Sequence, residues 1–483
     1  MQVERTELIL KPDQSRVLFL PFKPEREEQI LKIVARVLSL TTDEVDIEIE
    51  EVCKEFGDRH HNLFEFYLKR FDQISSYLIS DRKLRKNRKM LIGAYFTQEY
   101  SLESAALFNP SIVLHPDQSN LPKGSVRFVL SLRATGEGHI SSIVFRSGTI
   151  DVNNNISIEK PARFVTAPEV IPNPLYEKPL FERKLFELGL VNEFTNEILS
   201  HLGDVFLLNE LEECVESTIF QIRMRDGQNK VIANGILSLA RSNYEIVYDE
   251  NHHLSERIIF PHSPTETNGI EDARFVRFLN DDGSYIYYAS YTAFDGKVIL
   301  PQLLETTDFL SFKINTLNGP EVQNKGMALF PRKIDGMYAM LSRQDNENIY
   351  IMFSDNIHFW NTKKILLRPT FTWEMVLIGN CGSPIETEKG WLVLSHGVGP
   401  MRKYSIGAFL LDLQDPTKVI GRLEEPLLDP SENERVGYVP NVVYSCGSMI
   451  HGDELIIPYA MSDYASSFAK VNVNELLNEL TSS

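Results

Sequence analysis

The sequence predicts an all-β core in the form of a five-bladed β-propeller, with an N-terminal helical extension and a helical insertion. Three observations lead to this fold class. A pattern of two apolar strands around a polar turn recurs along the chain, short β-type runs begin near residue 96, and helical periodicity precedes them. A propeller protects its sheet edges by radial repetition, so short strands can build a stable core.

Four copies of the repeat follow one another in the second half of the chain. Each has an apolar strand, a polar turn with Gly and Asp or Lys, a second apolar strand and then a polar cluster. The copies begin near Asp272, Met327, Ser383 and Val439, so successive starts lie 55 or 56 residues apart. An earlier copy fits residues 107–145, which makes five. A pair of β-sandwiches is the alternative fold.

Helical periodicity predicts the parts outside the repeats. Residues 25–95 are expected to be mostly helical, because apolar residues such as Ile30, Ile33, Val34 and Val37 recur at helical spacing. We therefore expect an N-terminal helical region over 1–95 and a propeller over 96–483. The gap between the first two repeats predicts a helical insertion at about 175–205, packed with the N-terminal helices outside the blades. Its apolar positions are Leu185, Leu188, Phe194, Ile198 and Leu202.

A basic run follows the first helices. Its members are Arg82, Lys83, Arg85, Lys86, Arg88 and Lys89. A solvated helix end explains such a run, and a docking patch for a partner subunit or a polyanion is the alternative.

The composition limits the partners and the compartment. With 49 Lys and Arg against 67 Asp and Glu, the net charge of −18 argues against nucleic acid and anionic membranes as partners, but not against a small anionic substrate. No run of about 18 apolar residues predicts a membrane span, and the N-terminus lacks a secretion signal. Four scattered cysteines indicate neither a disulfide framework nor a zinc site. We expect a cytoplasmic protein without metal, and a homo-oligomer is compatible with the sequence.

Polar residues recur at equivalent places in the five repeats. The inner strand of each blade ends near a central channel, so these clusters are expected to converge there. A carboxylate opposite Lys, Arg and His indicates an acid beside a bound oxyanion, whereas paired carboxylates alone would indicate ordinary glycoside hydrolysis. In chain order the candidates are Arg133, His139, Glu271, Asp272, Arg274, Tyr291, Thr292, Asp295, Lys325, Arg343, His396, Arg402, Lys403, Asn441 and Asp463.

The main candidates also have structural interpretations. Glu271 and Asp272 would otherwise be a turn pair beside a strand, and Arg343 a cation that bridges two blades. His396 ends the apolar run WLVLSH, where a histidine at the edge of the core is the alternative. The NKG sequence around Lys325 is common turn chemistry.

Several motifs are spread over all five repeats, from FNPSIV near residue 108 to YAMSDY near residue 464. Between them lie GIEDAR, LFPRKIDGMYAMLSR, GWLVLSHGV, IGAFLLDLQDP and VPNVVYSCG. Together they resemble glycoside hydrolase family 130, the five-bladed propeller β-mannoside phosphorylases and β-1,2-mannosidases. Ala273 replaces the usual proline of the family, a tolerable change because alanine can adopt the same backbone angle. The family does not account for residues 1–95 or the insertion, so the chain resembles a longer branch of it.

The resemblance implies roles for individual residues. Asp272 matches the general acid of the family, which protonates the glycosidic oxygen through the 3-hydroxyl of the mannose in the −1 subsite. Arg133 and Asp463 match positions that hold this mannose. The positions that hold the attacking phosphate in phosphorylases correspond to Lys325, Arg343 and His396. The other expected substrate-binding residues are Glu271, Arg274, Asp295 and Tyr291, and strand packing is the alternative for Tyr291.

One departure from the family concerns the phosphate site. A further basic residue normally lies nineteen positions before the histidine, and here that position is Leu377. Arg402 and Lys403 are the candidates to replace this cation in space. Because this basic residue is missing, hydrolysis stays an alternative to phosphorolysis.

The expected function is an inverting β-mannoside phosphorylase that acts on β-linked manno-oligosaccharides, with inorganic phosphate as co-substrate and no cofactor. Phosphate attacks the anomeric carbon while Asp272 supplies a proton to the leaving oxygen, and α-mannose 1-phosphate is released. The first alternative is an inverting β-1,2-mannosidase, with Glu374 or Glu386 as the base that activates water. The second is a carbohydrate-binding propeller without catalysis, which has no need of the residues around Asp272.

Overall fold

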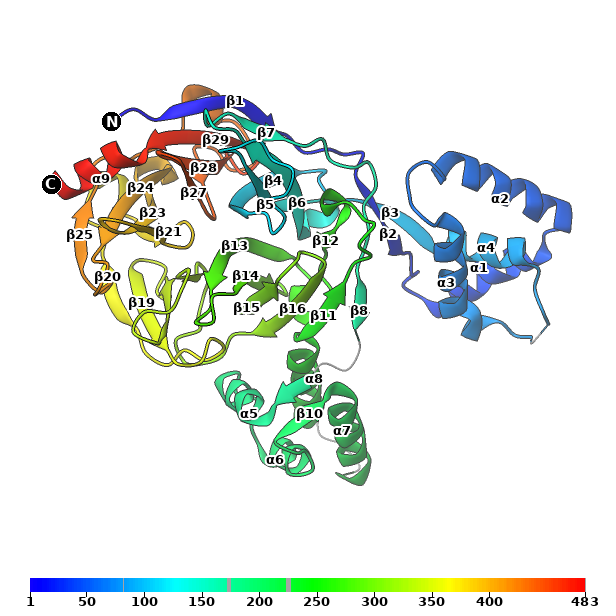
Figure 1. Ribbon diagram of the computed structural model, residues 1–483. Helices are drawn as coiled ribbons and strands as arrows, with labels where there is room; N and C mark the ends of the chain where they lie inside the picture. The colour runs from blue at the N-terminus through cyan, green and yellow to red at the C-terminus, as the bar shows by residue number, and fades with distance from the viewer. Residues whose placement is uncertain (81, 172–174, 223–226, 483) are drawn as a thin grey trace.

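The computed structural model describes residues 1–80, 82–171, 175–222 and 227–482. Within these ranges, five antiparallel sheets of four to six strands are arranged around a common centre (Figure 1). Two groups of helices project from the sheets. The predicted β-rich core with an N-terminal helical part and a helical insertion is confirmed.

The five sheets follow the order of the predicted repeats. The first contains β4 (Ala106–Leu114), β5 (Val126–Thr135), β6 (Ser141–Ile150), β7 (Ile156–Ile158) and β12 (Ile258–Ile259). The second contains β8 (Glu169–Ile171), β11 (Tyr244–Val247), β13 (Ile270–Leu279), β14 (Tyr285–Phe294), β15 (Ile299–Thr306) and β16 (Ser311–Thr316). The third contains β17 (Ala328–Leu329), β18 (Tyr338–Ser342), β19 (Ile349–Ser354) and β20 (Lys364–Leu367).

The last two sheets lie in the C-terminal part of the chain. The fourth contains β21 (Leu377–Asn380), β22 (Ile385–Thr387), β23 (Gly390–Val398), β24 (Tyr404–Leu411) and β25 (Val419–Arg422). The fifth contains β26 (Val443–Tyr444), β27 (Met449–His451), β28 (Glu454–Met461), β29 (Ala465–Asn472) and β1 (Glu4–Leu10). Helix α9 (Val473–Ser482) packs into the core between these two sheets.

Apolar side chains fill the space between neighbouring sheets. Phe145 of the first sheet meets Phe275 and Phe312 of the second, and further clusters join the second sheet to the third, the third to the fourth and the fourth to the fifth. A last cluster joins Phe468 of the fifth sheet to Phe128 of the first. Since most sheets are covered on both faces, strands such as β6 and β23 are buried nearly throughout instead of alternating.

The first strand of the chain belongs to the last sheet. Strand β1 pairs antiparallel with β29, so Glu4 lies opposite Lys470. Strand β2 (Val17–Pro21) then pairs with β3 (Thr97–Ser101), and this two-stranded ribbon carries the helices between them. Neither pairing was predicted from the sequence, and β1 lies within residues 1–95, the range predicted to be the N-terminal helical region.

The N-terminal helical unit consists of α1 (Glu27–Ser39), α2 (Thr42–Phe56), α3 (Leu63–Ile74) and α4 (Lys86–Tyr95), with a 3₁₀ turn η1 (Ser75–Tyr77). The predicted apolar face is confirmed, since Ile30, Val34 and Val37 are buried. Helix α2 begins with a capping box between Thr41 and Glu44, in which each residue satisfies the other's backbone N–H.

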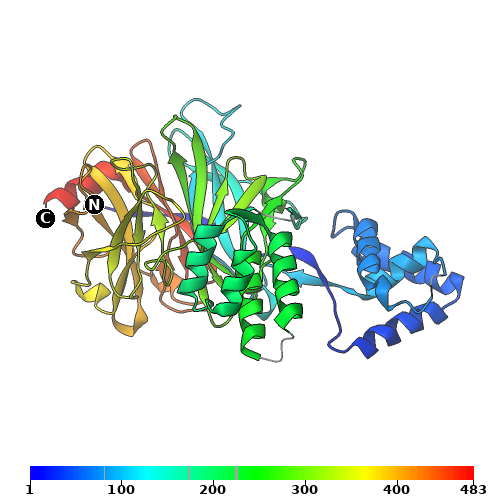
Figure 2. The same cartoon turned by 90° about the horizontal axis from the view of Figure 1, so that it is seen from below.

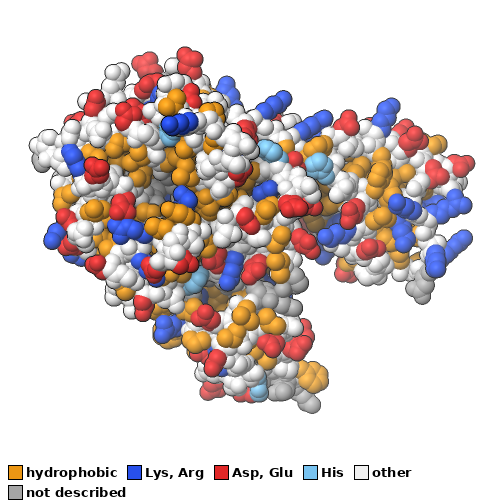
Figure 3. All heavy atoms as spheres, in the orientation of Figure 1, with side chains coloured by type: hydrophobic (Ala, Val, Ile, Leu, Met, Phe, Trp, Pro, Cys, Tyr) orange, Lys and Arg blue, Asp and Glu red, His pale blue; other side chains and the backbone are white. Residues whose placement is uncertain are grey.

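The basic run covers the segment just before α4 and the first turn of this helix. Lysine and arginine side chains gather over the helical unit on the face shown in Figure 3. Arg88 differs from its neighbours, because its guanidinium donates to the carbonyls of Val37, Leu38 and Leu40 at the end of α1. It therefore satisfies backbone carbonyls that a helix end leaves without partners.

The helical insertion is longer than the predicted 175–205. It contains α5 (Lys178–Glu187), α6 (Glu193–Ser200), α7 (Leu208–Ile222) and α8 (Gly227–Arg241), with a ribbon of β9 (Leu175–Glu177) and β10 (Val205–Leu207). Of its predicted core residues, Leu188 is exposed and the others are buried.

The prediction that the insertion packs with the N-terminal helices is wrong. Helices α5–α8 lie beside the second sheet, away from α1–α4 (Figures 1 and 2), and the two helical groups have separate cores. The reason is that the insertion is anchored to the sheets: α8 leads into β11, and the Glu187 carboxylate accepts a hydrogen bond from the Gly319 backbone at 2.8 Å. No helix of the described ranges has the length and apolar character needed to cross a bilayer.

Candidate active site

The predicted polar residues lie at one end of the sheets. In an antiparallel sheet the start of the first strand lies beside the turn that follows the second strand. In the second sheet, for example, Ile270 at the start of β13 pairs with Ala293 near the end of β14. The start of β13 carries Asp272, and the corresponding turns of the third and fifth sheets carry Arg343 and Asp463.

Two neighbouring sheets place a left-handed residue at the same point of their first strand. The register of β13 shifts between Glu271 and Arg274, and that of β4 shifts between Phe108 and Ser111. Inside these bulges Asp272 has φ 55° and Asn109 has φ 49°. A bulge of this kind redirects a side chain, and left-handed backbone at a residue other than glycine is typical of functional sites.

The two left-handed side chains meet. Asn109 Nδ2 donates to Asp272 Oδ1 at 2.6 Å, and both residues are buried. The sequence analysis did not select Asn109. The available signal was the position of FNP in the first repeat, which corresponds to that of EDA in the second.

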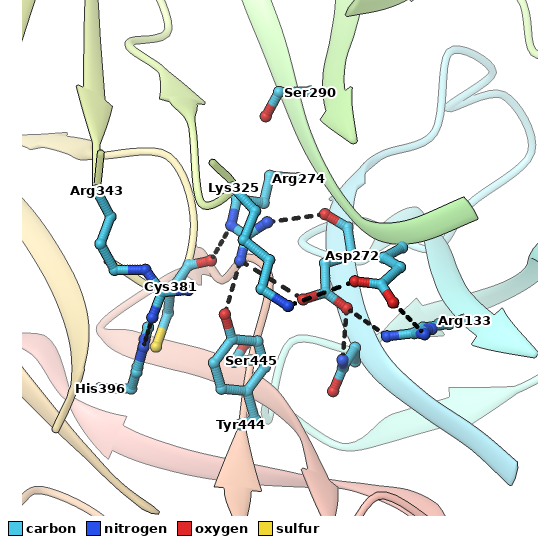
Figure 4. Close-up of polar contacts among 12 residues, drawn as sticks. Arg133, Asp272, Arg274, Ser290, Lys325, Arg343, Cys381, His396, Tyr444 and Ser445 are labelled. Carbon is cyan, nitrogen blue, oxygen red and sulfur yellow. Dashed lines mark hydrogen bonds and ion pairs between the residues drawn. The ribbon is translucent and has the colours of Figure 1, made fainter. Parts of the chain in front are cut away.

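Cations surround the two adjacent carboxylates (Figure 4). Glu271 lies 2.8 Å from Arg133 NH2 and 3.4 Å from Lys325 Nζ. Asp272 Oδ1 lies 3.4 Å from Arg133 NH1. The structure thus brings together Arg133, Glu271, Asp272 and Lys325, which come from three different sheets or the loops beside them.

The guanidinium of Arg274 forms its hydrogen bonds with other groups of the protein. Its guanidinium donates to the backbone carbonyl of Asp272 at 2.9 Å, to the carbonyl of Cys381 at 3.0 Å and to the Tyr444 hydroxyl at 2.7 Å. Only 2% of its surface is exposed. Arg274 therefore fixes the backbone of Asp272 to the fourth and fifth sheets.

Arg343 and His396 form a second group on the opposite side of the site (Figure 4). Arg343 NH1 lies 3.1 Å from His396 Nε2, and both side chains are buried. Burial, together with the charges of Arg343 and Arg274, lowers the pKa of His396 well below its usual value. The ring is therefore neutral. The predicted phosphate-binding role of His396 would therefore rest on a neutral ring that donates a hydrogen bond, and not on a positive charge.

The hydrogen-bond pattern fixes the tautomer of this histidine. Because Arg343 can only donate, His396 Nε2 accepts and Nδ1 carries the proton. Neither this Nδ1–H nor the Nε–H of Arg343 has a partner among the described residues. Two buried donors without acceptors are costly, so this place suits an oxyanion.

The two aspartates of the site have opposite pKa shifts. Burial would raise the pKa of Asp272, but the charges of Arg133, Arg274 and Lys325 and the hydrogen bond from Asn109 outweigh it and lower the pKa to about 2. For Asp463, burial and the negative charge of Asp272 raise the pKa to about 6. In the free protein at neutral pH, Asp272 is thus an anion and Asp463 is the carboxyl that takes up a proton more readily.

Other predicted residues do not join these groups. The Tyr291 hydroxyl donates to Glu266 at 2.7 Å, and Asp295 Oδ1 accepts from the backbone of Lys297 and Val298 in its own turn. Successive residues of a strand point to opposite faces, which sends Tyr291 away from the site. No group of three His, Cys, Asp or Glu side chains in the part of the chain that the structure describes is placed to hold a metal ion.

The alternative carboxylates and one replacement cation are engaged elsewhere. Glu374 is fully buried and pairs with Arg422, and Glu386 pairs with Arg332 at 2.7 Å. Lys403 pairs with Asp429 at 2.9 Å.

Comparison with known proteins identifies the family. The model of the family described as beta-1,4-mannooligosaccharide phosphorylase matches residues 225–482. The 1,2-beta-oligomannan phosphorylase of Thermoanaerobacter sp. (strain X514) is 36% identical over 231 residues, covering 46% of this chain and 75% of the relative. The beta-1,2-mannobiose phosphorylase of Listeria innocua is 32% identical over 243 residues, covering 48% and 66%. A solved structure of a Listeria innocua beta-1,2-mannobiose phosphorylase in complex with beta-1,2-mannobiose aligns over 78% of this chain and 93% of that chain, with 24% identity and a TM-score of 0.47.

The family model and the Thermoanaerobacter relative define an enzyme that acts on glycosides. The chain belongs to glycoside hydrolase family 130.

Proposed function

We propose that this enzyme is an inverting phosphorylase of β-linked manno-oligosaccharides that releases α-mannose 1-phosphate. The observation that carries the proposal is the pair Arg343 and His396 across the site from Asp272. Each has one buried N–H donor without a partner in the described part of the chain. Arg343 and His396, with Lys325, bind phosphate. The names of the relatives, which are phosphorylases of mannosides, support the same reaction.

The reaction exchanges one bond at the anomeric carbon for another. A phosphate oxygen forms a bond to this carbon while its bond to the leaving sugar breaks, and the leaving oxygen takes a proton supplied by Asp272. Inversion follows because nucleophile and leaving group occupy opposite sides of the carbon. Arg133, Glu271 and Asp463 hold the sugar that is transferred.

Asp272 has a low pKa in the free protein, and this fits an acid that takes up its proton only when the substrates bind. A phosphate dianion near Lys325 offsets the positive charge that lowers this pKa, so its binding raises the pKa of Asp272.

Hydrolysis is the weaker alternative. An inverting hydrolase needs a carboxylate base beside the attacking water. Both carboxylates considered for this role, Glu374 and Glu386, are paired with arginines outside the site. The cation missing at Leu377 is replaced, in our proposal, by Arg402, since Lys403 is occupied by Asp429.

We also propose that the five sheets are the blades of a five-bladed β-propeller, formed by residues 96–483 together with β1. The ring of apolar clusters from the first sheet to the fifth and back to the first supports this architecture. The N-terminal helical unit is then a separate domain. A cytoplasmic location and assembly into homo-oligomers stay predictions.

The test is incubation with β-1,2- and β-1,4-mannobiose, each with and without phosphate. We expect mannose 1-phosphate and mannose in equal amounts when phosphate is present, and no turnover without it. Equal release of free mannose in both tubes would show that the enzyme is a hydrolase. The variant Asp272→Asn is expected to lose turnover by a factor of about 10²–10⁴.

A further inference from the structure

Three turns at the site share one backbone feature. Gly138 and His139, Met401 and Arg402, and Ser462 and Asp463 are pairs of successive residues with positive φ, between 47° and 65°. In each pair the second residue lies two positions before the next strand, β6, β24 or β29. His139 and Arg402 therefore hold the same place in the first and fourth sheets that Asp463 holds in the fifth.

An exposed tyrosine lies against the first of these turns. The ring of Tyr438 lies beside that of His139 in a tilted arrangement, with centroids 5.5 Å apart and planes inclined by 33°. Tyr438 remains 60% exposed. One face of its ring is thus supported by protein while much of the ring stays open to solvent.

The segment that carries Tyr438 is fixed beside Asp463. The Val439 backbone donates to the Ser462 carbonyl at 3.0 Å. Gly437 lies so close that a Cβ on it would come within 2.5 Å of the same carbonyl oxygen. The position of the ring is therefore set by the turn that presents Asp463.

The turn that carries His139 is also attached to β13, the strand that carries Asp272. Directly after this turn, Ser141 Oγ donates to the Ile270 carbonyl at 3.0 Å. Gly269 has φ 118°, and a Cβ there would come within 2.5 Å of Ser141 Oγ. His139, which contacts Tyr438, is thus joined through Ser141 to the strand that carries Asp272. Arg343 and His396 lie on the other side of Asp272 from Arg133 (Figure 4).

We propose that Tyr438, supported by His139, is the stacking platform for the sugar ring that leaves in the reaction. This inference rests on the proposed function. In an inverting displacement the leaving sugar lies on the side of the acid, opposite to phosphate, and the exposed rim is where a released sugar can exit. Sugar rings present C–H faces that pack on aromatic rings, and an amphipathic Tyr suits a site that is partly wet.

The test compares Tyr438→Ala with Tyr438→Phe, which keeps the ring. Phe186→Ala is the control, because Phe186 is an exposed aromatic residue on α5, outside the site. For phosphorolysis of the mannobiose that the wild type cleaves faster, Tyr438→Ala should raise the KM for this disaccharide about tenfold and leave the KM for phosphate within about twofold. In the reverse reaction its KM for the acceptor mannose should rise similarly. Tyr438→Phe and Phe186→Ala should match the wild type.

A binding measurement separates this inference from the proposed function. Calorimetric titration of the same mannobiose into Asp272→Asn and into Asp272→Asn/Tyr438→Ala needs no turnover. Binding that is about tenfold weaker in the double variant supports the platform, even if the wild-type enzyme proves to be a hydrolase. Equal binding by the two variants, with thermal unfolding curves that show both to be folded, would overturn it.

Discussion

Asn109 donates a hydrogen bond to the carboxylate of Asp272 from the matching position of the neighbouring sheet, and both residues are in left-handed backbone. The bond favours the charged form of Asp272 and orients its carboxylate. Asn109 is therefore expected to position the acid and not to touch the nucleophile.

Replacing Asn109 with Ala should raise the pKa of Asp272, because a bond to the carboxylate form is lost. If Asp272 acts in its protonated form, the basic limb of the profile of kcat/KM against pH moves to higher pH. Loss of orientation should lower kcat about tenfold. The exposed turn residue Asn153 provides the control variant Asn153→Ala. A profile with an unchanged basic limb would contradict the positioning role.

Replacing Arg343 with Ala should affect phosphate far more than sugar. It removes the partner of His396 and one of the unpartnered buried donors. Because hydrogen bonds to charged groups contribute about 1.5–3 kcal/mol, the KM for phosphate should rise about 10-fold to 100-fold while the KM for mannobiose changes little. Initial rates over a matrix of both substrate concentrations give the two values. The same measurement on Arg36→Ala, an exposed position on α1, is the control, and an unchanged phosphate dependence would exclude Arg343 from the phosphate site.

Replacing Asp463 with Asn should stabilise the protein at neutral pH. The folded state raises the pKa of Asp463 from 3.8 to about 6, through burial and the charge of Asp272, against the opposing charges of Arg133, Arg402 and Lys325. Between these two values the folded state holds more protons than the unfolded state, so stability falls as the pH rises. The charged form therefore costs the folded protein about 3 kcal/mol at pH 7, about 0.5 kcal/mol at pH 4, and nothing well below both pKa values.

Urea unfolding of the wild type and of Asp463→Asn at pH 4 and pH 7 tests this linkage. The gain should be large at pH 7 and shrink to about a fifth of that size at pH 4. A gain of the same size at both values would mean that packing, not charge, separates the two proteins.

Replacing Arg88 with Ala should destabilise the N-terminal helical unit. Three carbonyls at the end of α1 lose their donor, at an expected cost of about 1–3 kcal/mol. Lys83→Ala, from the exposed part of the same basic run, should stay within about 0.5 kcal/mol of the wild type. Thermal unfolding measures the stability of both variants. An equal loss of stability in the two would mean that the effect comes from removing a positive charge and not from the hydrogen bonds to the end of α1.

Local patterns explain what the sequence could predict. The repeats were visible because strand, turn and strand follow one another within a few residues. The strands after each predicted start share one sheet, except that β21 (Leu377–Asn380) precedes the start at Ser383 and belongs to the fourth sheet. The pairing of β1 with β29 was not predicted, because it joins residues more than 450 positions apart and seven residues carry no signal of such a partner. Packing of the insertion likewise depends on contacts such as that of Glu187 with Gly319.

The same limit applies to the site. Residue type identified His396 but not its charge state, which burial among Arg343 and Arg274 decides. Alternation along β14 shows that neighbours of Tyr291 lie on the other face, but which face is turned to the site depends on the pairing of β14 with β13, and the sequence of one strand does not contain this register. Asn109 gained its role from meeting Asp272 across two sheets, and no single repeat contains both residues.

The ribbon of β2 and β3 has a consequence for how such a chain can change over time. Pro21 lies opposite Thr97, and the Phe22 backbone donates to the Phe96 carbonyl at 2.9 Å. The chain thus enters and leaves the helical unit at the same point. A single insertion or deletion at this place can therefore add or remove the whole helical unit. Only a short turn would remain between β2 and β3, and the strands of the five sheets would keep their positions.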